Sequence, residues 1–229
     1  MDFATMGDNI IKILVKYWDK FLIEGLGYTL SLSAITVIFG ALFAAVLAFM
    51  KMSKIAPLRW ISAAYIEIIR GTPMLLQLYF FYFFLPMIVT ALKKEQYACL
   101  AIALICNSAA YVSEVIRSGI QAVDHGQTEA AYSLGMSKSL TMTTIVLPQA
   151  LKNILPALGN EFIMIIKDTS LASTFFIGDL MTQYLLVKGT TYLPIEPLVI
   201  VAVIYFVVTF ILSKVFGLIE RRMNRGYAH

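Results

Sequence analysis

The sequence predicts an all-α membrane protein with five membrane-spanning helices. Of its 229 residues, 59% are hydrophobic and only 14% are charged. Soluble domains hold roughly 45–50% apolar and about 25% charged residues, so the chain departs from both values. Its mean hydropathy is +0.79. The apolar residues also gather in long runs, and a helix needs about 20 such residues to cross a bilayer.

The first expected element is a helix within residues 1–20, which form a separate N-terminal segment. Lys12, Lys16 and Lys20 recur every four residues and share one side, while apolar residues occupy the other side. This pattern is typical of an amphipathic helix that lies in the membrane interface. A second interpretation makes the same residues the beginning of the first span.

Five apolar runs follow along the chain. The sequence Arg70-Gly71-Thr72-Pro73 interrupts the second run. Because Pro73 lacks a backbone N–H and its ring clashes with the preceding turn, this helix should kink or break there. The expected spans cover residues 23–50, 60–89, 96–116, 145–166 and 198–218, with an irregular polar segment over residues 167–197.

Five spans place the two termini on opposite sides of the membrane. Lysine and arginine are enriched in cytoplasmic loops, and the loops on one side carry the larger share of them. The C-terminus, with a tail over residues 221–229, is therefore expected in the cytoplasm and the N-terminus outside. The N-terminal lysines favour the opposite orientation. The cations assigned to the cytoplasm are Lys51, Lys54, Arg59, Arg117, Lys138, Arg221, Arg222 and Arg225.

The sequence also excludes several functions. It contains no GxxxxGK[ST] phosphate-binding loop, so the chain should not hydrolyse nucleotide by itself. It has no cluster with metal-ligand spacing, and we expect neither a metal nor a cofactor on this chain. Its basic residues flank apolar runs, which indicates membrane topology rather than nucleic-acid binding. Cys99 and Cys106 would lie roughly 10 Å apart on one helix, too far for a disulfide.

A short polar helix is expected at about residues 127–136, between the third and fourth spans. Glu129 lies near its beginning, where the helix dipole favours a negative charge. Ala130 and Ala131 are strong helix formers with small side chains. Gly135 suits the left-handed residue that ends a helix. These features predict either a helix on which another protein docks or an ordinary interfacial helix.

The same stretch carries the spacing EAA-x3-G-x9-I-x-LP, beginning at Glu129. This spacing resembles the EAA motif of permease subunits in bacterial ABC importers that work with a binding protein. The segments "YIEIIRGTPMLLQL" and "LPQALKNILPALGNEFIMIIKDTSL" are similar to the polar amino acid branch of that family. The resemblance covers about residues 20–225.

The resemblance implies a type I ABC importer transmembrane fold over residues 21–220, with five core helices and a short cytoplasmic coupling helix. It implies a bacterial inner-membrane location and a second permease subunit, either a copy of this chain or a sister chain. It further implies a cytoplasmic ABC ATPase dimer that binds ATP and Mg, and an extracytoplasmic amino-acid-binding protein. Membrane lipid would surround the assembly. The residues implied to couple with the ATPase are Glu129, Ala130, Ala131, Gly135 and Met136.

Polar residues inside the expected spans are candidates for the transport pathway, because charges there are costly and usually functional. Each cluster also has a structural interpretation. Glu67 and Arg70 can pair across one helical turn, and Lys167 can pair with Asp168 at the interface. A stripe from Asn107 to Glu114 can line a pore or join helices. The expected substrate-binding residues are Thr72, Met74, Asn107, Ser108, Glu161, Met164, Lys167 and Asp168.

The expected substrate is a polar amino acid. If Glu161 and Asp168 are both ionised in the cavity, they would attract a cationic side chain, as in arginine, lysine or histidine. If Glu161 is engaged by a neighbour, glutamine or cystine would fit equally well. Lys167 could meet the carboxylate of the substrate. The rival hypothesis is a membrane scaffold that anchors a cytoplasmic partner and transports nothing.

Overall fold

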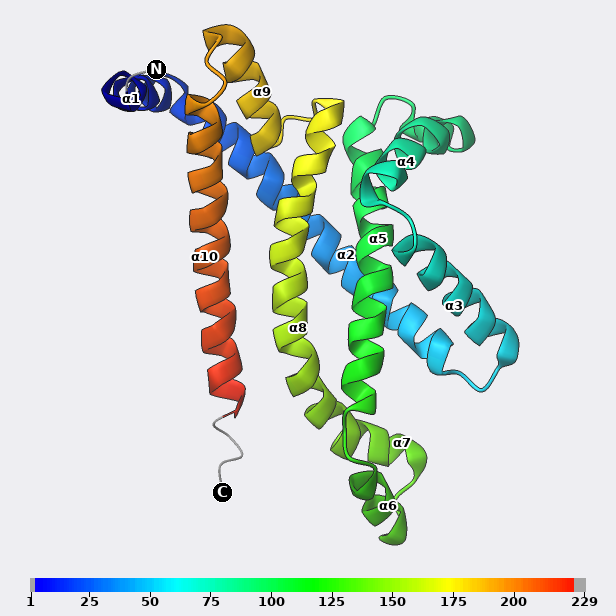
Figure 1. Ribbon diagram of the computed structural model, residues 1–229. Helices are drawn as coiled ribbons and strands as arrows, with labels where there is room; N and C mark the ends of the chain where they lie inside the picture. Colours follow the sequence, from blue (N-terminus) through cyan, green and yellow to red (C-terminus); the bar gives the residue numbers. More distant parts are fainter. Residues whose placement is uncertain (1–2, 225–229) are drawn as a thin grey trace. The chain divides into compact units, whose positions relative to one another are not determined.

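The computed structural model describes residues 3–224, and these residues form helices and turns without a β-strand (Figure 1). Residues 221–224 of the expected tail continue the last helix, and residues 225–229 lie outside the described part. The α-helices are α1 (Phe3–Asp19), α2 (Leu26–Met52), α3 (Ala56–Arg70), α4 (Met74–Ile88), α5 (Gln96–Gln121), α6 (His125–Ser133), α7 (Lys138–Thr141), α8 (Leu147–Asp168), α9 (Leu180–Thr191) and α10 (Glu196–Asn224). The π-helical and 3-10 segments are η1 (Lys20–Gly25), η2 (Thr90–Leu92), η3 (Met142–Val146) and η4 (Thr169–Phe175).

The described residues form two compact units. Unit 1 contains the chain up to Val37, residues 74–104 and residues 163–212. Unit 2 contains residues 38–73, residues 105–162 and the described residues from Ser213 onward. Each of the long helices α2, α5, α8 and α10 therefore contributes one stretch to each unit.

Membrane-spanning character is found in most of the expected runs. By length and composition, Thr5–Met52, Gln96–Gln121 and Glu196–Met223 can each cross a membrane, and α3 with α4 can form one further, broken span. The break between Arg70 and Met74 confirms the prediction made from Pro73. The expected fourth run forms the continuous helix α8, which carries polar side chains such as Lys152 and Glu161 and is not among the helices apolar enough to count as spans.

The N-terminal residues form a helix of their own. Helix α1 is followed by the π-helical turn η1, and Tyr17 has non-helical backbone angles (φ −122°, ψ 22°) near the junction. Figure 1 shows α1 turned out of line with α2. Ile13 and Phe21 are buried against Leu180, Val187 and their neighbours. The segment thus packs on α9 and α10 and does not simply extend α2.

Helix α9 is held close to the first span in unit 1. A Cβ added to Gly25 would lie 2.9 Å from the Cα of Leu180 and 2.9 Å from Cγ of Gln183. The backbone N–H of Leu180 donates to Oγ1 of the buried Thr29 at 3.1 Å. Asp179 caps α9 by accepting from the backbone N–H of Met181 at 3.0 Å and from the Thr182 hydroxyl. Glycine at position 25 therefore permits this close approach.

Small residues bring helices together in unit 2. A Cβ on Gly40 would lie 2.9 Å from Oγ of Ser108, and a Cβ on Gly119 would overlap the side chain of Ile154. These contacts join α2 to α5 and α5 to α8. Small residues at such contacts are typical of helices packed within membranes. A core of Ala44, Leu47, Ala109 and Val112 lies between α2 and α5.

Candidate functional site

Helix α6 begins where a side chain satisfies its first free N–H groups. Asp124 is the N-cap, and its Oδ1 accepts from the backbone N–H of Gly126 at 2.7 Å. The helix therefore begins at His125, two residues before the expected start, and ends at Ser133. Residues 134–137 form the turn that follows. Glu129 lies in the middle of the helix rather than in its first turn.

Gly135 ends α6 in the left-handed conformation that the sequence predicts. Its φ is +79°. Its N–H donates to the carbonyl of Tyr132 at 2.9 Å, and the N–H of Met136 donates to the carbonyl of Ala131 at 3.1 Å. This pair of bonds is the Schellman arrangement, which satisfies the last carbonyls of a helix. Hydrogen bonds donated by Gly135 and by Met136 therefore fix this turn.

The outer surface of α6 and its turn combines polar and apolar side chains. Glu129, Ala130 and Gly135 are exposed and Met136 is half-buried. Ala131 is only 4% exposed and packs within the chain, so of the five expected coupling residues it has the least surface to offer a partner. Leu134 is 83% exposed. The sequence interpretation missed Leu134, although a large apolar residue before a helix-ending glycine was visible.

The chain continues from α6 into α8 through a helical run with altered geometry. Ser137 caps α7 by accepting from the N–H of Leu140 at 3.3 Å. The π-helical turn η3 then precedes Pro148, the second residue of α8. Because Pro148 has no N–H to donate to the preceding turn, a change in hydrogen bonding is required there. Pro148 thus lies at the beginning of the fourth run, as expected.

The expected substrate residues are distributed between the two units. Thr72, Asn107, Ser108 and Glu161 belong to unit 2, and Met74, Met164, Lys167 and Asp168 belong to unit 1. Neither unit contains all eight residues.

Two of the unit 2 candidates have clear structural roles. The Thr72 hydroxyl donates to the carbonyl of Ile68 at 2.9 Å and also approaches that of Ile69, and so closes the end of α3. Ser108 is 2% exposed and lies against Gly40. This burial favours the helix-joining interpretation of Ser108 over the pore-lining one. Asn107 and Glu161 are half-buried.

The unit 1 candidates differ in exposure. Met74 packs on the core around Leu78 and Leu100. Met164 and Lys167 are exposed, and Asp168 is half-buried. Lys167 also lies at a groove of about 240 Å³ that is otherwise mainly apolar, with Ser170, Met181, Leu198, Val201, Ala202 and Tyr205.

The expected pair between Glu67 and Arg70 does not form. The guanidinium of Arg70 lies over the ring of Tyr111, 5.2 Å from the ring centroid. Nearby, the Tyr65 hydroxyl donates to the carbonyl of Cys106 at 2.8 Å and also joins α3 to α5. A cation over an aromatic face keeps its edge donors available, whereas a carboxylate would have occupied them. Sequence spacing alone could not choose between these two partners.

Metal-binding side chains do not gather in the described residues. Across residues 3–224, no three His, Cys, Asp or Glu side chains are arranged to hold a metal ion. Cys99 and Cys106 are free thiols, in agreement with their expected separation.

Comparison with known proteins identifies the family. Residues 36–225 match the model of the "Binding-protein-dependent transport system inner membrane component". The chain belongs to this family. The chain is 40% identical to the arginine transport system permease protein ArtQ of Bacillus subtilis (strain 168), over 89% of this chain and 93% of that protein. It is 41% identical to the putative glutamine transport system permease protein GlnP of Rickettsia bellii (strain RML369-C), over 93% and 99%.

A solved structure supports the same assignment of fold. The crystal structure of an amino acid ABC transporter with histidines contains a chain that is 44% identical to this one. The two superpose with a TM-score of 0.84 over 97% of this chain and 99% of that chain. The chain therefore has the transmembrane fold of an ABC importer.

Proposed function

We propose that this chain is the permease subunit of an ATP-driven importer of polar amino acids. Its family description names a binding-protein-dependent transport system, and similar proteins are named for arginine and glutamine transport. The alternative, a scaffold that transports nothing, accounts for α6 but gives no reason for polar side chains along α5 and α8. The observation that carries the proposal is the exposed turn of α6 at the EAA spacing.

Helix α6 is the coupling helix in this proposal. Glu129, Ala130 and Met136 would contact the partner ATPase, and the exposed Leu134 would add an apolar anchor. Gly135 would fix the direction of the chain beyond the contact, and Ala131 would hold the helix to its own subunit. A stiff, capped helix suits this role because movement of the partner would displace it as a unit.

The remaining partners follow from the division of labour. The ATPase dimer would supply ATP and Mg binding, since this chain has no phosphate-binding loop. A second permease subunit would complete the pathway, and an extracytoplasmic binding protein would deliver the amino acid. The C-terminus would lie in the cytoplasm and the N-terminus outside the bacterial inner membrane. Helix α1, with its lysines, would lie along the outer interface.

The substrate would be cationic or neutral and polar. Glu161 and Asp168 would attract an ammonium or a basic side chain, and Lys167 would contact the substrate carboxylate. Thr72, Met74, Asn107 and Met164 would complete the pathway, and Ser108 would hold α5 to α2 beside it. The names of similar proteins include both a basic and a neutral amino acid, so both classes belong in the test.

The proposal is tested by uptake into proteoliposomes that contain the complete complex. Labelled arginine, lysine, histidine, glutamine and cystine are supplied singly with the binding protein, and ATP is supplied on the ATPase side. We expect ATP-dependent accumulation of at least one of them. Accumulation of none, in a complex that retains its ATPase, would favour the scaffold. Glu161→Gln should weaken the stimulation of ATP hydrolysis by the transported amino acid, and unchanged stimulation would remove Glu161 from the pathway.

A further inference from the structure

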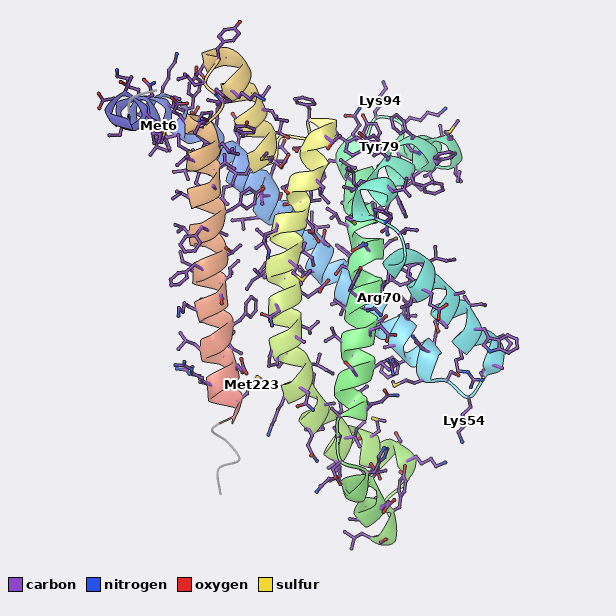
Figure 2. All side chains as sticks on the ribbon, in the orientation of Figure 1. Met6, Lys54, Arg70, Tyr79, Lys94 and Met223 are labelled. Atoms are coloured by element: carbon purple, nitrogen blue, oxygen red, sulfur yellow. The ribbon has the colours of Figure 1, made fainter. Side chains whose placement is uncertain are left out.

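Arg70 carries a charge deep within the membrane-spanning part of unit 2. It is the last residue of α3, and Figure 2 shows it where α3 reaches the ribbon of α5. Its neighbour Tyr111 lies ten residues from the end of α5 at Gln121 and fifteen from the beginning at Gln96. At 1.5 Å per residue, these separations are about 15 Å and 22 Å. A hydrocarbon core is about 30 Å thick, so the pair lies well inside it.

No carboxylate of the described chain neutralises Arg70. Glu67, one turn earlier on the same helix, makes no ion pair with it, and the nearby Glu114 is bound by Lys51 and Arg117. The contact that the structure gives to the guanidinium is the face of Tyr111 at 5.2 Å. Arginine has five N–H donors at the edge of its plane, and stacking uses only the face.

The exposure of Arg70 indicates which way it points in an assembly. Its side chain is exposed in this single chain. An arginine placed in lipid at the middle of a helix costs roughly 2.5–3.5 kcal/mol, and such residues almost always face a protein interior or a water-filled cavity. The helix is also broken beside it, between Arg70 and Met74. Irregular backbone at membrane depth is tolerated where it lines such a cavity.

We propose that Arg70, held by Tyr111, binds the α-carboxylate of the transported amino acid. This inference rests on the proposed import function. It moves the carboxylate contact proposed for Lys167 to Arg70, for which sequence spacing had suggested a pair with Glu67. A guanidinium binds a carboxylate through two parallel N–H···O bonds, which a lysine ammonium cannot reproduce. Every amino acid carries this carboxylate, so the site suits substrates with different side chains. Asn107 lies one helical turn from Tyr111 on the same face of α5.

The test measures direct binding of amino acids to the complete transporter in nanodiscs. The binding protein is left out because its own selectivity would otherwise contribute to the result. The probes are labelled L-arginine with agmatine, which lacks the α-carboxylate, and L-glutamine with L-glutaminamide, in which the carboxylate is an amide. We expect the wild type to bind the carboxylate-bearing member of at least one pair about tenfold or more tightly. Arg70→Gln should remove this preference, with a smaller effect on the analogue.

Matched variants separate this role from a structural one. Glu67→Gln changes a charge on the same helix and should keep the preference. Tyr111→Phe keeps the aromatic face and should keep it as well, whereas Tyr111→Leu should weaken it. If Arg70→Gln fails to assemble, Arg70→Lys keeps the positive charge and should still lose most of the preference. An Arg70 variant that discriminates as well as the wild type would overturn the inference, while absence of uptake of any amino acid by the wild type would instead refute the proposed function.

Discussion

The ammonium nitrogen of Lys51 lies 2.6 Å from Oε1 of Glu114 and joins the end of α2 to α5. Nη2 of Arg117 lies 2.7 Å from the other carboxylate oxygen, and Nη1 of Arg117 donates to Gln121 at 2.6 Å. Helix α5 ends at Gln121, and Asp124 then caps α6. This network therefore links the first span to the last turns of α5, the helix that leads into α6.

Removal of the Glu114 charge should loosen this link. Glu114→Gln leaves two cations facing a neutral amide, and a half-buried pair of this kind contributes about 1–2 kcal/mol. For a chain of this length each kcal/mol corresponds to about 2–4 °C in Tm. The measurement is thermal unfolding of the purified chain. Glu95→Gln, at an exposed position without an ion pair, is the control, and equal Tm values for the two variants would contradict a stabilising role.

Glycine at position 25 should be required for the attachment of α9. In Gly25→Ala the new methyl would meet backbone at 2.9 Å, so the helices must separate, and overpacking of this kind costs about 1–3 kcal/mol. Gly27→Ala is a close control, because a Cβ there meets nothing within 4 Å. We expect a lower Tm for the first variant and an unchanged or higher Tm for the second. Tolerance of both substitutions would show that the close approach has no energetic importance.

The buried carboxyl of Asp179 should make stability depend on pH. Burial raises its pKa above the ordinary value of 3.8, and hydrogen bonds from Thr182 and Met181 offset only part of this effect. As pH rises from 3.8 toward the raised pKa, the unfolded chain releases a proton that the folded chain retains. Stability therefore falls as pH rises through that interval, and the loss persists above it.

Asp179→Asn should remove this contribution while keeping an acceptor that can cap α9. The Tm difference between variant and wild type should shift in favour of the variant as pH rises from about 4 to 7. Asp8→Asn, at an exposed position, controls for the loss of a charge. A Tm difference for Asp179→Asn that stays constant over this range would contradict the raised pKa.

Local chemistry allowed much of the fold to be predicted. Pro73 marked the break between α3 and α4, and Gly135 marked the left-handed end of α6, because each residue restricts its own backbone. Helix α6 begins two residues before the approximate start predicted from the sequence, because Asp124 caps it by accepting from the N–H of Gly126. The expected fourth span forms helix α8, but α8 is not among the candidate spans, because its polar side chains lower the mean hydropathy of the helix.

Contacts between distant residues could not be predicted in the same way. The i, i+3 spacing of Glu67 and Arg70 suggested an ion pair, but packing of α3 against α5 placed Tyr111 under the guanidinium instead. Ser108 was a candidate lining residue until its contact with Gly40 appeared. Both outcomes depend on which faces of two helices meet, and one sequence does not specify that choice.

ATP-driven uptake by a Gly135→Pro variant tests the central claim, that α6 and its turn couple this permease to its ATPase. Proline cannot adopt the φ of +79° found at Gly135 and cannot donate to Tyr132. In proteoliposomes with the same ATPase and binding protein, we expect uptake to fall to background while the loaded binding protein still binds. Gly217→Ala, a helical glycine with free space around its Cβ, should transport normally. Normal uptake by Gly135→Pro would contradict the account.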